Sequence, residues 1–535
     1  MYLKTRRVIG VVTAVLLAMG AFAGCAANGS SSPNGAAAAD TASAAEATAA
    51  ADNSAATAGV DLSTPYTVNF VVEQPQQNMS DQDAVESYLN DYLAQPGHLP
   101  NTKVHFTFYT QDQILNKVQL DAASGIKHDL ISGAGMPAGA LNAMVTAGVI
   151  SPMTNDMLNT CAPDIMSEIL PKYWPATTIN NQIYAVPNPF VYSQPVGWVV
   201  QKTIAEKYNY DPSTYHQLSD LGPLLAQIKA GEPNMVPFLP DLGGGRAILA
   251  SSNSYCDTIL SGIVYDCNQN KLEWVFDDPT VAANCAALVD FYQKGYMPTN
   301  LSSLLSSTGG NKVQQTGTYA VMSDSGGYDP TAAKSEAGYG MPLVPVLISN
   351  CIIGTGKVQT VYVSLSATSD NPERAMMFEN YLYKDKTFAN YVGYGKPDLN
   401  FTYVSGEGTD TPTVQWDNKS NWVIWICWIS PLWDQWDSSW NTTAALNLMH
   451  QQTDTAPVSP VLGFTPDTEP IKNQVASITQ LYTTAMGVLE QGAEGDAAAY
   501  LAQLKDQANN AGLQQILDTL NEQISQWQST NGAGN

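Results

Sequence analysis

Charged residues are scarce in this 535-residue chain, and positive ones are the scarcest. Asp, Glu, Lys and Arg make up only 13% of it, with 23 Lys and Arg against 48 Asp and Glu. The formal net charge of −25 disfavours binding to nucleic acids and anionic lipid surfaces, which require clustered positive charge. With so few charges, the surface must be rich in Asn, Gln, Ser, Thr and Tyr, which suit hydrogen bonding to neutral polyols.

Sequence motifs of common catalytic and cofactor sites are also absent. No GxSxG, HExxH or GxGxxG occurs, and Gly354-Thr-Gly-Lys357 lacks the upstream glycine and the following Ser or Thr of a phosphate-binding loop. The five histidines are dispersed. We therefore expect no catalytic residue, no metal and no cofactor. A glycosidase needs two carboxylates about 5 to 10 Å apart, and plentiful acids leave such a pair open.

Cysteine is scarce too, and none of the seven belongs to a CxxC pair or a metal-ligand spacing. Cys256 and Cys267 lie 11 positions apart and can close a small disulfide loop in an oxidising compartment. Buried free thiols explain the six cysteines after Cys25 equally well. The sequence therefore leaves this disulfide open.

Only one apolar run is long, and it lies near the first residue. Lys4, Arg6 and Arg7 precede an apolar stretch over 8–23, which is too short to span a membrane and is typical of an export signal. The small residues before Cys25 make this segment resemble a bacterial lipobox. The resemblance implies cleavage directly before that cysteine and a lipid on its sulfur. An ordinary signal peptide with an incidental cysteine is the alternative.

The segment that follows lacks aromatic residues and apolar periodicity. Residues 26–59 are almost entirely Ala, Ser, Thr, Asn, Gly and Asp, and this composition cannot bury enough surface to offset the entropy of ordering. We expect a signal peptide over 1–24 and a lipid-anchored flexible linker over 25–60. Loss of the three basic signal residues changes the net charge to −28. The body is then held at the outer face of the cytoplasmic membrane.

The body begins with alternating strand and helix signals. Period-two alternation predicts strands, and apolar residues three and four apart predict helices. The order β-α-β-α-β-α predicts a parallel sheet flanked by helices, which binds ligands at the carboxyl ends of its strands. We therefore expect the loops after Val72, Thr110 and Ile131 to face a ligand. The predicted elements are strands 66–72, 103–110 and 129–131, a helix after Ser80, and helices over 111–123 and 138–149.

Later segments continue the alternation of strand and helix signals, and the C-terminal region is predicted to be helical. Asn371 followed by Pro372 is a well-defined helix start. The other predicted elements are strands 183–186, 197–201, 319–322 and 361–365 and helices over 218–229 and 471–489, after Asp496 and over 513–527.

Six passages match short motifs of one family in the right order: Asn181–Pro187, Gly197–Lys202, Gly317–Met322, Ala367–Ala375, Ser459–Phe464 and Gln523–Trp527. Together they resemble the extracellular solute-binding subunits of bacterial ABC importers, in the large family that includes sugar- and oligosaccharide-binding lipoproteins. The resemblance spans nearly the whole body and rests on the order of the motifs rather than on any single one.

This resemblance implies an α/β protein with a two-lobed periplasmic-binding-protein-like fold, a hinge and an interlobe cleft, plus C-terminal helices. By analogy, lobe 1 is 61–190 and 315–368, lobe 2 is 191–314 and 369–460, and a helical C-terminal module covers 461–535. We expect a monomer that is not an enzyme. It would bind a small-molecule ligand, hand it to ABC permease subunits, and stay at the membrane through the lipid on Cys25.

Tryptophan is concentrated in one segment. Seven of the 11 tryptophans lie within residues 416–440. Indole faces stack on the apolar face of a pyranose, while neighbouring amides and acids bind its hydroxyls. We expect Trp425 and Trp428 to line the cleft. The alternative is that the segment packs lobe 2 against the C-terminal helices.

Other candidate ligand-binding residues lie at predicted strand ends and at the predicted lobe crossing. Glu73 and Gln74 directly follow the first strand, and Phe190, Tyr192 and Gln194 lie at the crossing. The remaining candidates, in loops after later strands, are Asp241, Ser325 and Tyr328. Ordinary loop chemistry without a ligand is the alternative for each of them.

The sequence thus favours a lipid-anchored solute-binding protein of an ABC importer, with an oligosaccharide as its cargo. An anchored carbohydrate-active hydrolase, an adhesion or scaffold lipoprotein, and a binding protein for peptide cargo are the alternatives. The acidic composition disfavours anionic cargo.

Overall fold

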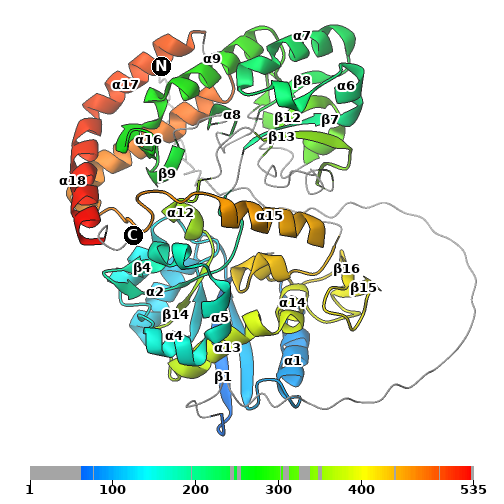
Figure 1. The fold of residues 1–535 in the computed structure, drawn as a ribbon, viewed down its shortest axis with the longest axis vertical. Coiled ribbons are helices and arrows are strands. Elements are labelled where there is room, and N and C mark those ends of the chain that lie inside the picture. Colours follow the sequence, from blue (N-terminus) through cyan, green and yellow to red (C-terminus); the bar gives the residue numbers. More distant parts are fainter. Residues whose placement is uncertain are drawn as a thin grey trace, which may run out of the picture.

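In a computed structural model of the chain, two lobes lie one above the other (Figure 1). No helix in the described part of the chain combines the length and apolar content that crossing a bilayer requires. The predicted signal peptide, the lipidation site Cys25 and the linker lie outside the described residues. The described residues are 62–75, 78–193, 196–240, 246–249, 255–301, 303–304, 312–324, 336, 338–347, 352–438, 441–492 and 495–531.

Lobe 1 is built on a five-stranded sheet with the order β2-β1-β3-β14-β6. β1 pairs in parallel with β2 and β3, whereas β14 is antiparallel to both β3 and β6. The strands are β1 (Tyr66–Glu73), β2 (Thr102–Tyr109), β3 (Leu130–Ser132), β6 (Val186–Pro187) and β14 (Tyr362–Leu365). The predicted strands 66–72 and 103–110 are confirmed, and alternating residues such as Val104 and Phe106 are buried.

Helices cover both faces of this sheet. One face packs against α1 (Gln82–Leu93) and α13 (Pro372–Lys384), and the other against α2 (Ile114–Ser124) and α3 (Ala140–Thr146). The Asn371 side chain caps α13 by accepting a 3.0 Å hydrogen bond from the Arg374 amide. Lobe 1 also contains α4 (Asn155–Cys161), α5 (Pro163–Glu168), η1 (Pro171–Thr177), α14 (Lys386–Tyr394), β15 (Phe401–Ser405), β16 (Thr413–Trp416), η8 (Ile426–Trp428), η9 (Leu432–Asp434) and α15 (Thr443–Thr455).

Lobe 2 contains a four-stranded sheet with the order β13-β7-β12-β8 and a three-stranded sheet with the order β11-β10-β9. The strands are β7 (Gly197–Gln201), β8 (Val236–Leu239), β9 (Tyr255–Leu260), β10 (Ile263–Asp266), β11 (Lys271–Trp274), β12 (Tyr319–Asp324) and β13 (Leu343–Leu347). Its helices include α6 (Lys202–Lys207), α7 (Gly222–Gly231) and α9 (Pro279–Gln293).

The three C-terminal helices are part of lobe 2 rather than a separate body. These are α16 (Lys472–Leu489), α17 (Ala497–Asn510) and α18 (Leu513–Asn531), of which the first two lie beside α9 in Figure 1. They bury apolar residues in the same core as the lobe 2 sheets. Gly492, with a φ of 60°, passes so close to α9 that a Cβ atom there would lie 2.3 Å from the Leu288 backbone oxygen. The helices predicted after residue 470 are confirmed.

The lobe boundaries taken from the family analogy differ from those of the structure. β12 and β13 pair with β7 in lobe 2, although 315–368 was expected in lobe 1. Conversely, α13 to α15 lie in the core of lobe 1, although 369–460 was expected in lobe 2. The physical reason is that strand pairing across more than a hundred residues leaves no local pattern, so an apolar strand predicts no particular sheet. The predicted strand 183–186 is also divided, because β5 covers Gln182–Ile183 and β6 begins at Val186.

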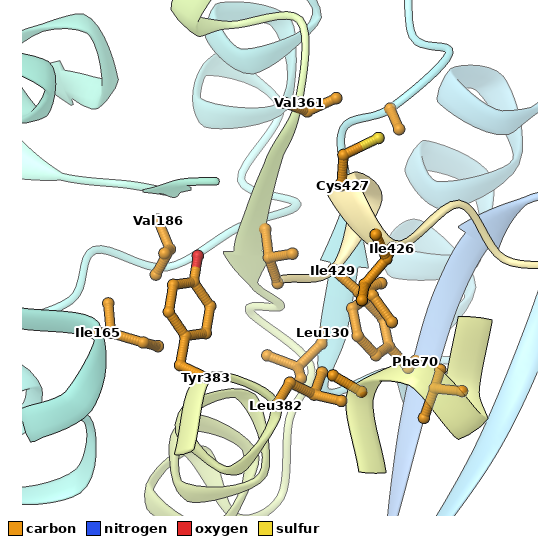
Figure 2. Packing of buried hydrophobic residues seen from close by; sticks show 14 of the residues in the cluster. Phe70, Leu130, Ile165, Val186, Val361, Leu382, Tyr383, Ile426, Cys427 and Ile429 are labelled. Carbon is orange, nitrogen blue, oxygen red and sulfur yellow. The ribbon is translucent and has the colours of Figure 1, made fainter. Parts of the chain in front are cut away.

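The core of lobe 1 encloses a carboxyl group without a partner. Figure 2 shows Leu382 and Tyr383 of α13 among buried residues from the central sheet and segment 426–429. Glu379, one turn earlier on the same helix, is 0% exposed, and neither of its carboxyl oxygens has a hydrogen-bond partner among the described residues. Burial raises the pKa of Glu379 well above its ordinary value of 4.5.

Glu379 should therefore make the protein less stable as pH rises. The native state retains a proton that the unfolded state releases above about pH 4.5, so the free energy of unfolding falls above that pH. Replacing the group by an apolar side chain of similar length, Glu379→Met, should raise the free energy of unfolding at pH 8 by about 1–3 kcal/mol. Urea unfolding at pH 5 and pH 8 measures this.

The matched control is Glu373→Met, which removes an exposed carboxylate from the first turn of the same helix. It should leave the pH dependence of stability unchanged. A Glu379→Met variant with the wild-type difference between pH 5 and pH 8 would show that Glu379 is not neutral in the native core.

Candidate functional site between the lobes

The path of the chain turns the carboxyl ends of the lobe 1 strands toward lobe 2. β1, β2 and β3 are parallel, and β6 runs in the same direction because β14 is antiparallel to both β3 and β6. The chain leaves β6 at Pro187 and enters the first strand of lobe 2 at Gly197. The carboxyl ends of β1, β2 and β3 therefore lie at the edge where the chain crosses between lobes.

The four-stranded sheet of lobe 2 presents a corresponding edge. Asp324 at the end of β12 and Leu347 at the end of β13 both lie opposite Gly197, the first residue of β7. β8 is parallel to β12, so its carboxyl end at Leu239 lies at this edge too. Open α/β sheets bind ligands at the carboxyl ends of their strands. The two edges that meet at the crossing define the candidate site.

Glu73, the last residue of β1, places a carboxyl group at the lobe 1 edge. Its side chain is half-buried, and it makes no hydrogen bond or ion pair with any described residue. Burial raises the pKa of Glu73 to about 7, from an ordinary value of 4.5. A carboxyl group that has no protein partner and ionises near neutral pH is suited to accept hydrogen bonds from ligand hydroxyls.

The loop after β3 lies in close contact with Glu73. Gly135 has a φ of 72°, and a Cβ atom there would lie 1.9 Å from Oε2 of Glu73. A Cβ atom at Gly133 would lie 2.0 Å from the ring of Tyr362, the first residue of β14. Only glycine fits at these positions. The strand pattern predicted that the loop after Ile131 faces a ligand, but it did not single out these two glycines. Glycines directly after a buried strand can mark a close approach of the backbone to another group.

The tryptophan-rich segment packs on lobe 1. The Ser132 hydroxyl donates a 3.0 Å hydrogen bond to the backbone oxygen of Trp428, which holds the segment beside the carboxyl end of β3. Trp422 is 0% exposed, whereas Trp425 and Trp428 are half-buried against the same core. The alternative of packing between lobe 2 and the C-terminal helices is therefore wrong. A ligand contact through Trp425 or Trp428 stays a prediction.

Other tryptophans of this segment have protein partners. Trp433 stacks on the ring of His450, with centroids 4.5 Å apart and an interplanar angle of 10°. Trp416 meets Trp425 edge-on at 6.0 Å, and Trp436 is buried in an aromatic cluster with Tyr394. Most of the aromatic excess therefore stabilises lobe 1.

The crossing residues Phe190 and Tyr192 belong to the lobe 1 core. They are 6% and 0% exposed, and the Tyr192 hydroxyl donates a hydrogen bond to the backbone oxygen of Asn188. Both side chains also line a small pocket together with Tyr173 and Trp433. Their predicted roles as ligand contacts stay predictions. Gln74 is half-buried, and its backbone amide donates a 2.8 Å hydrogen bond to the Tyr109 backbone oxygen at the same edge as Glu73.

The other predicted site residues, Gln194, Asp241, Ser325 and Tyr328, lie outside the described residues. In sequence, Asp241 and Ser325 closely follow the residues that end β8 and β12. Their predicted roles therefore stay predictions.

Cys267 is disulfide-bonded, whereas Cys161, Cys285 and Cys427 are buried free thiols. In the β9–β10 ladder Tyr255 lies opposite Asp266, which brings the backbones of Cys256 and Cys267 close together. The Cys256 side chain is not among those described, so the predicted pairing stays a prediction. Within the described ranges, no three His, Cys, Asp or Glu side chains are grouped closely enough to hold a metal ion.

Comparison with known proteins agrees with this architecture. Residues 87–417 match the family model of the bacterial extracellular solute-binding proteins, and the chain belongs to this family. Residues 460–529 match a second model, described as a domain of unknown function. A carbohydrate ABC transporter substrate-binding protein of Streptococcus pneumoniae is 23% identical over 343 residues, which is 60% of this chain and 65% of the relative.

Solved structures share the whole fold. The N-glycan transport solute-binding protein NgtS of Streptococcus pneumoniae matches with a TM-score of 0.72 at 19% identity, over 86% of this chain and 99% of that one. Its complex with Man5GlcNAc matches with a TM-score of 0.63, over 88% and 99% of the two chains. An extracellular solute-binding protein of Bifidobacterium longum subsp. infantis matches at 0.60 and 14% identity, over 86% and 98%.

The contact between Gly135 and Glu73 can be tested by adding one methyl group. Gly135→Ala should strain the backbone and force the Glu73 carboxyl group out of its position. Gly139→Ala is the matched control, because Gly139 has a φ of 82° and open space around its missing Cβ. The control should cost about 1–2 kcal/mol of unfolding free energy from the backbone strain alone.

Gly135→Ala should cost about 1–3 kcal/mol more than the control. Combining it with Glu73→Ala should recover most of that extra cost, because the two side chains then no longer overlap. Urea unfolding of these three variants and of Glu73→Ala alone measures both effects. Equal destabilisation by Gly135→Ala and Gly139→Ala would contradict the contact.

Proposed function

We propose that the protein captures an oligosaccharide between its lobes and delivers it intact to the permease of an ABC importer. The observation that carries this proposal is the pair of strand-end edges at the crossing, with the Glu73 carboxyl group, which no described residue pairs with, at one of them. Membership of the solute-binding family supports it. The protein acts by binding and release, and it carries out no chemical step.

An oligosaccharide is the ligand class that fits the composition of the lobe 1 edge. Half-buried Trp425 and Trp428 offer indole faces for pyranose rings, and Glu73 offers a hydroxyl acceptor. The net charge disfavours anionic cargo. The structural relative crystallised with Man5GlcNAc makes mannose-containing glycans the first class to test.

We further propose that a lipid on Cys25 and the linker over 25–60 hold the body at the outer face of the cytoplasmic membrane. The composition of these segments supports this arrangement. A linker of this length has a reach of roughly 30 Å, enough for the body to bind solute and then dock on a permease.

The direct test is calorimetric titration of the full chain in detergent with Man5GlcNAc, other neutral glycans and tripeptides, followed by mass spectrometry of the recovered solute. We expect one glycan class to bind and to be recovered intact. A glycan recovered in fragments would indicate a hydrolase, and a bound tripeptide would overturn the cargo assignment. An absence of binding by every solute would contradict capture between the lobes.

Glu73 should give this binding a pH dependence. Because its pKa is about 7, the carboxylate form that accepts hydroxyl hydrogen bonds becomes dominant as pH rises. The affinity for the glycan should therefore be higher at pH 8 than at pH 6. Glu73→Gln should weaken binding about tenfold at pH 8 and abolish the pH dependence. Titrations of both proteins at the two pH values measure this.

The stability of the free protein should respond in the opposite direction. A raised pKa in the native state means that the free energy of unfolding falls as pH rises through about 7, and Glu73→Gln should remove this contribution. The matched control is Glu373→Gln. Glu373 lies in the first turn of α13, which follows the carboxyl end of β14. A control variant with the same loss of affinity would contradict a specific role for Glu73.

A further inference from the structure

Two later crossings between the lobes lie side by side. The first runs from β13 of lobe 2 through α12 (Thr355–Val358) into β14 of lobe 1, and the second runs from α15 through 457–464 into the C-terminal helices. Ile353 pairs in parallel with Val458, its amide donates to the Pro457 oxygen at 2.9 Å, and its oxygen accepts from the Ser459 amide at 2.8 Å. Figure 1 shows α12 between the two lobes, near β9.

A buried carboxyl group of lobe 2 fastens the first of these crossings. Oδ2 of Asp257, in β9, accepts hydrogen bonds from the Thr355 amide at 2.9 Å and from the Thr355 hydroxyl at 3.2 Å. Asp257 is 4% exposed and Thr355 is 7% exposed. Burial raises the pKa of Asp257 to about 6, and hydrogen bonds from Thr355 and Ser459 and the charge of Lys357 oppose that rise.

The Thr355 hydroxyl also joins the two crossings. Its oxygen accepts a 2.9 Å hydrogen bond from the Gly463 amide and lies 3.4 Å from the Val461 backbone oxygen. One side chain thus contacts β9 of lobe 2, the helix between the lobes and the later crossing.

Both crossings are anchored in both lobes. In the later crossing, Val461 and Phe464 are buried in the lobe 2 core, whereas Leu462 is buried in the lobe 1 core. A Cβ atom at Gly463, which has a φ of 96°, would lie 2.6 Å from the Pro175 oxygen of lobe 1.

In α12, Val358 is buried in the lobe 1 core, and Gln359 directly after the helix donates to the Ala176 oxygen at 2.7 Å. The neighbours of this contact region are thus fixed in opposite cores on its two sides, as the neighbours of a turning point between two lobes would be.

We infer that Asp257 and Thr355, together with segment 459–464, form the pivot about which the lobes close on a solute. This inference rests on the proposed function, and it gives the Ser459–Phe464 motif a role. Asp257 and Thr355 are positioning residues: they touch no solute, and they set the angle and range over which the two strand-end edges approach each other.

The sharpest variants change Thr355. Thr355→Val keeps the side-chain shape but removes the hydroxyl, whereas Thr355→Ser keeps the hydroxyl. The readout is the distance between spin labels at Lys117→Cys in α2 and Glu206→Cys in α6, two exposed positions in different lobes. Thr355→Val should broaden the distance distribution of the unliganded full chain, and Thr355→Ser should restore the wild-type distribution.

Binding provides a second readout. Thr355→Val should raise the dissociation constant for the bound glycan about tenfold, mainly through faster dissociation, because closure no longer ends in one defined arrangement. The melting temperature of Thr355→Ser should equal that of the wild type. A Thr355→Val chain with wild-type distances and wild-type dissociation rates would overturn the pivot.

If Thr355→Val fails to fold, aspartate variants test the same pivot. Asp257→Asn should broaden the distances in the same way. The matched control is Asp266→Asn, because Asp266 is also buried in the three-stranded sheet and accepts two backbone hydrogen bonds, from Asn268 and Gln269, in its own turn. Equal distance distributions in these two variants would overturn the pivot.

The distance measurement needs no ligand. A failure of the proposed function would appear as a wild-type chain that binds no glycan, whatever the distances show. A failure of the pivot would appear as unchanged distances, whether or not glycan binds.

Discussion

The architecture depends on where the chain leaves lobe 1. Because β6 runs parallel to β1 and β3, the chain departs from the edge at which those strands end. It then enters lobe 2 at β7, opposite the ends of β12 and β13. A single crossing thus brings the loop-bearing edges of two sheets together. The polar and aromatic groups for binding can then come from loops, while both cores stay apolar.

The candidate site lowers the stability of the protein at one position, Glu73. The half-buried Glu73 carboxyl group receives no hydrogen bond from a described residue, and burial raises its pKa toward neutrality. The loop after β3 makes contact through Gly135 and offers no hydrogen bond to compensate. A group left in this condition retains its hydrogen-bonding capacity for a ligand. Glu379 shows the contrast, since its carboxyl group is fully enclosed and has no access to solute.

Local elements were largely predictable from the sequence, and their assembly was not. Alternation over 103–110 and helical spacing over 513–527 report directly on burial, so the corresponding strand and helix are confirmed. The placement of β12 in lobe 2 depends on pairing with a strand more than a hundred residues away, which no local pattern encodes. The position of Glu73 at the end of β1 was predictable, because a carboxylate after an apolar strand has a defined place in a parallel sheet. The burial of Phe190 and Tyr192 was not predictable, because residues at a crossing can face the core as readily as the solute.

The central claim is that solute is held between the ends of both sheets. Hydrogen–deuterium exchange of the full chain, with and without a bound glycan, tests it most directly. We expect ligand-dependent protection in peptides covering Glu73, Gly133 to Met136 and Trp425 to Trp428, and in peptides that end β8 and β12. Protection confined to one lobe, or found only on the C-terminal helices, would contradict it.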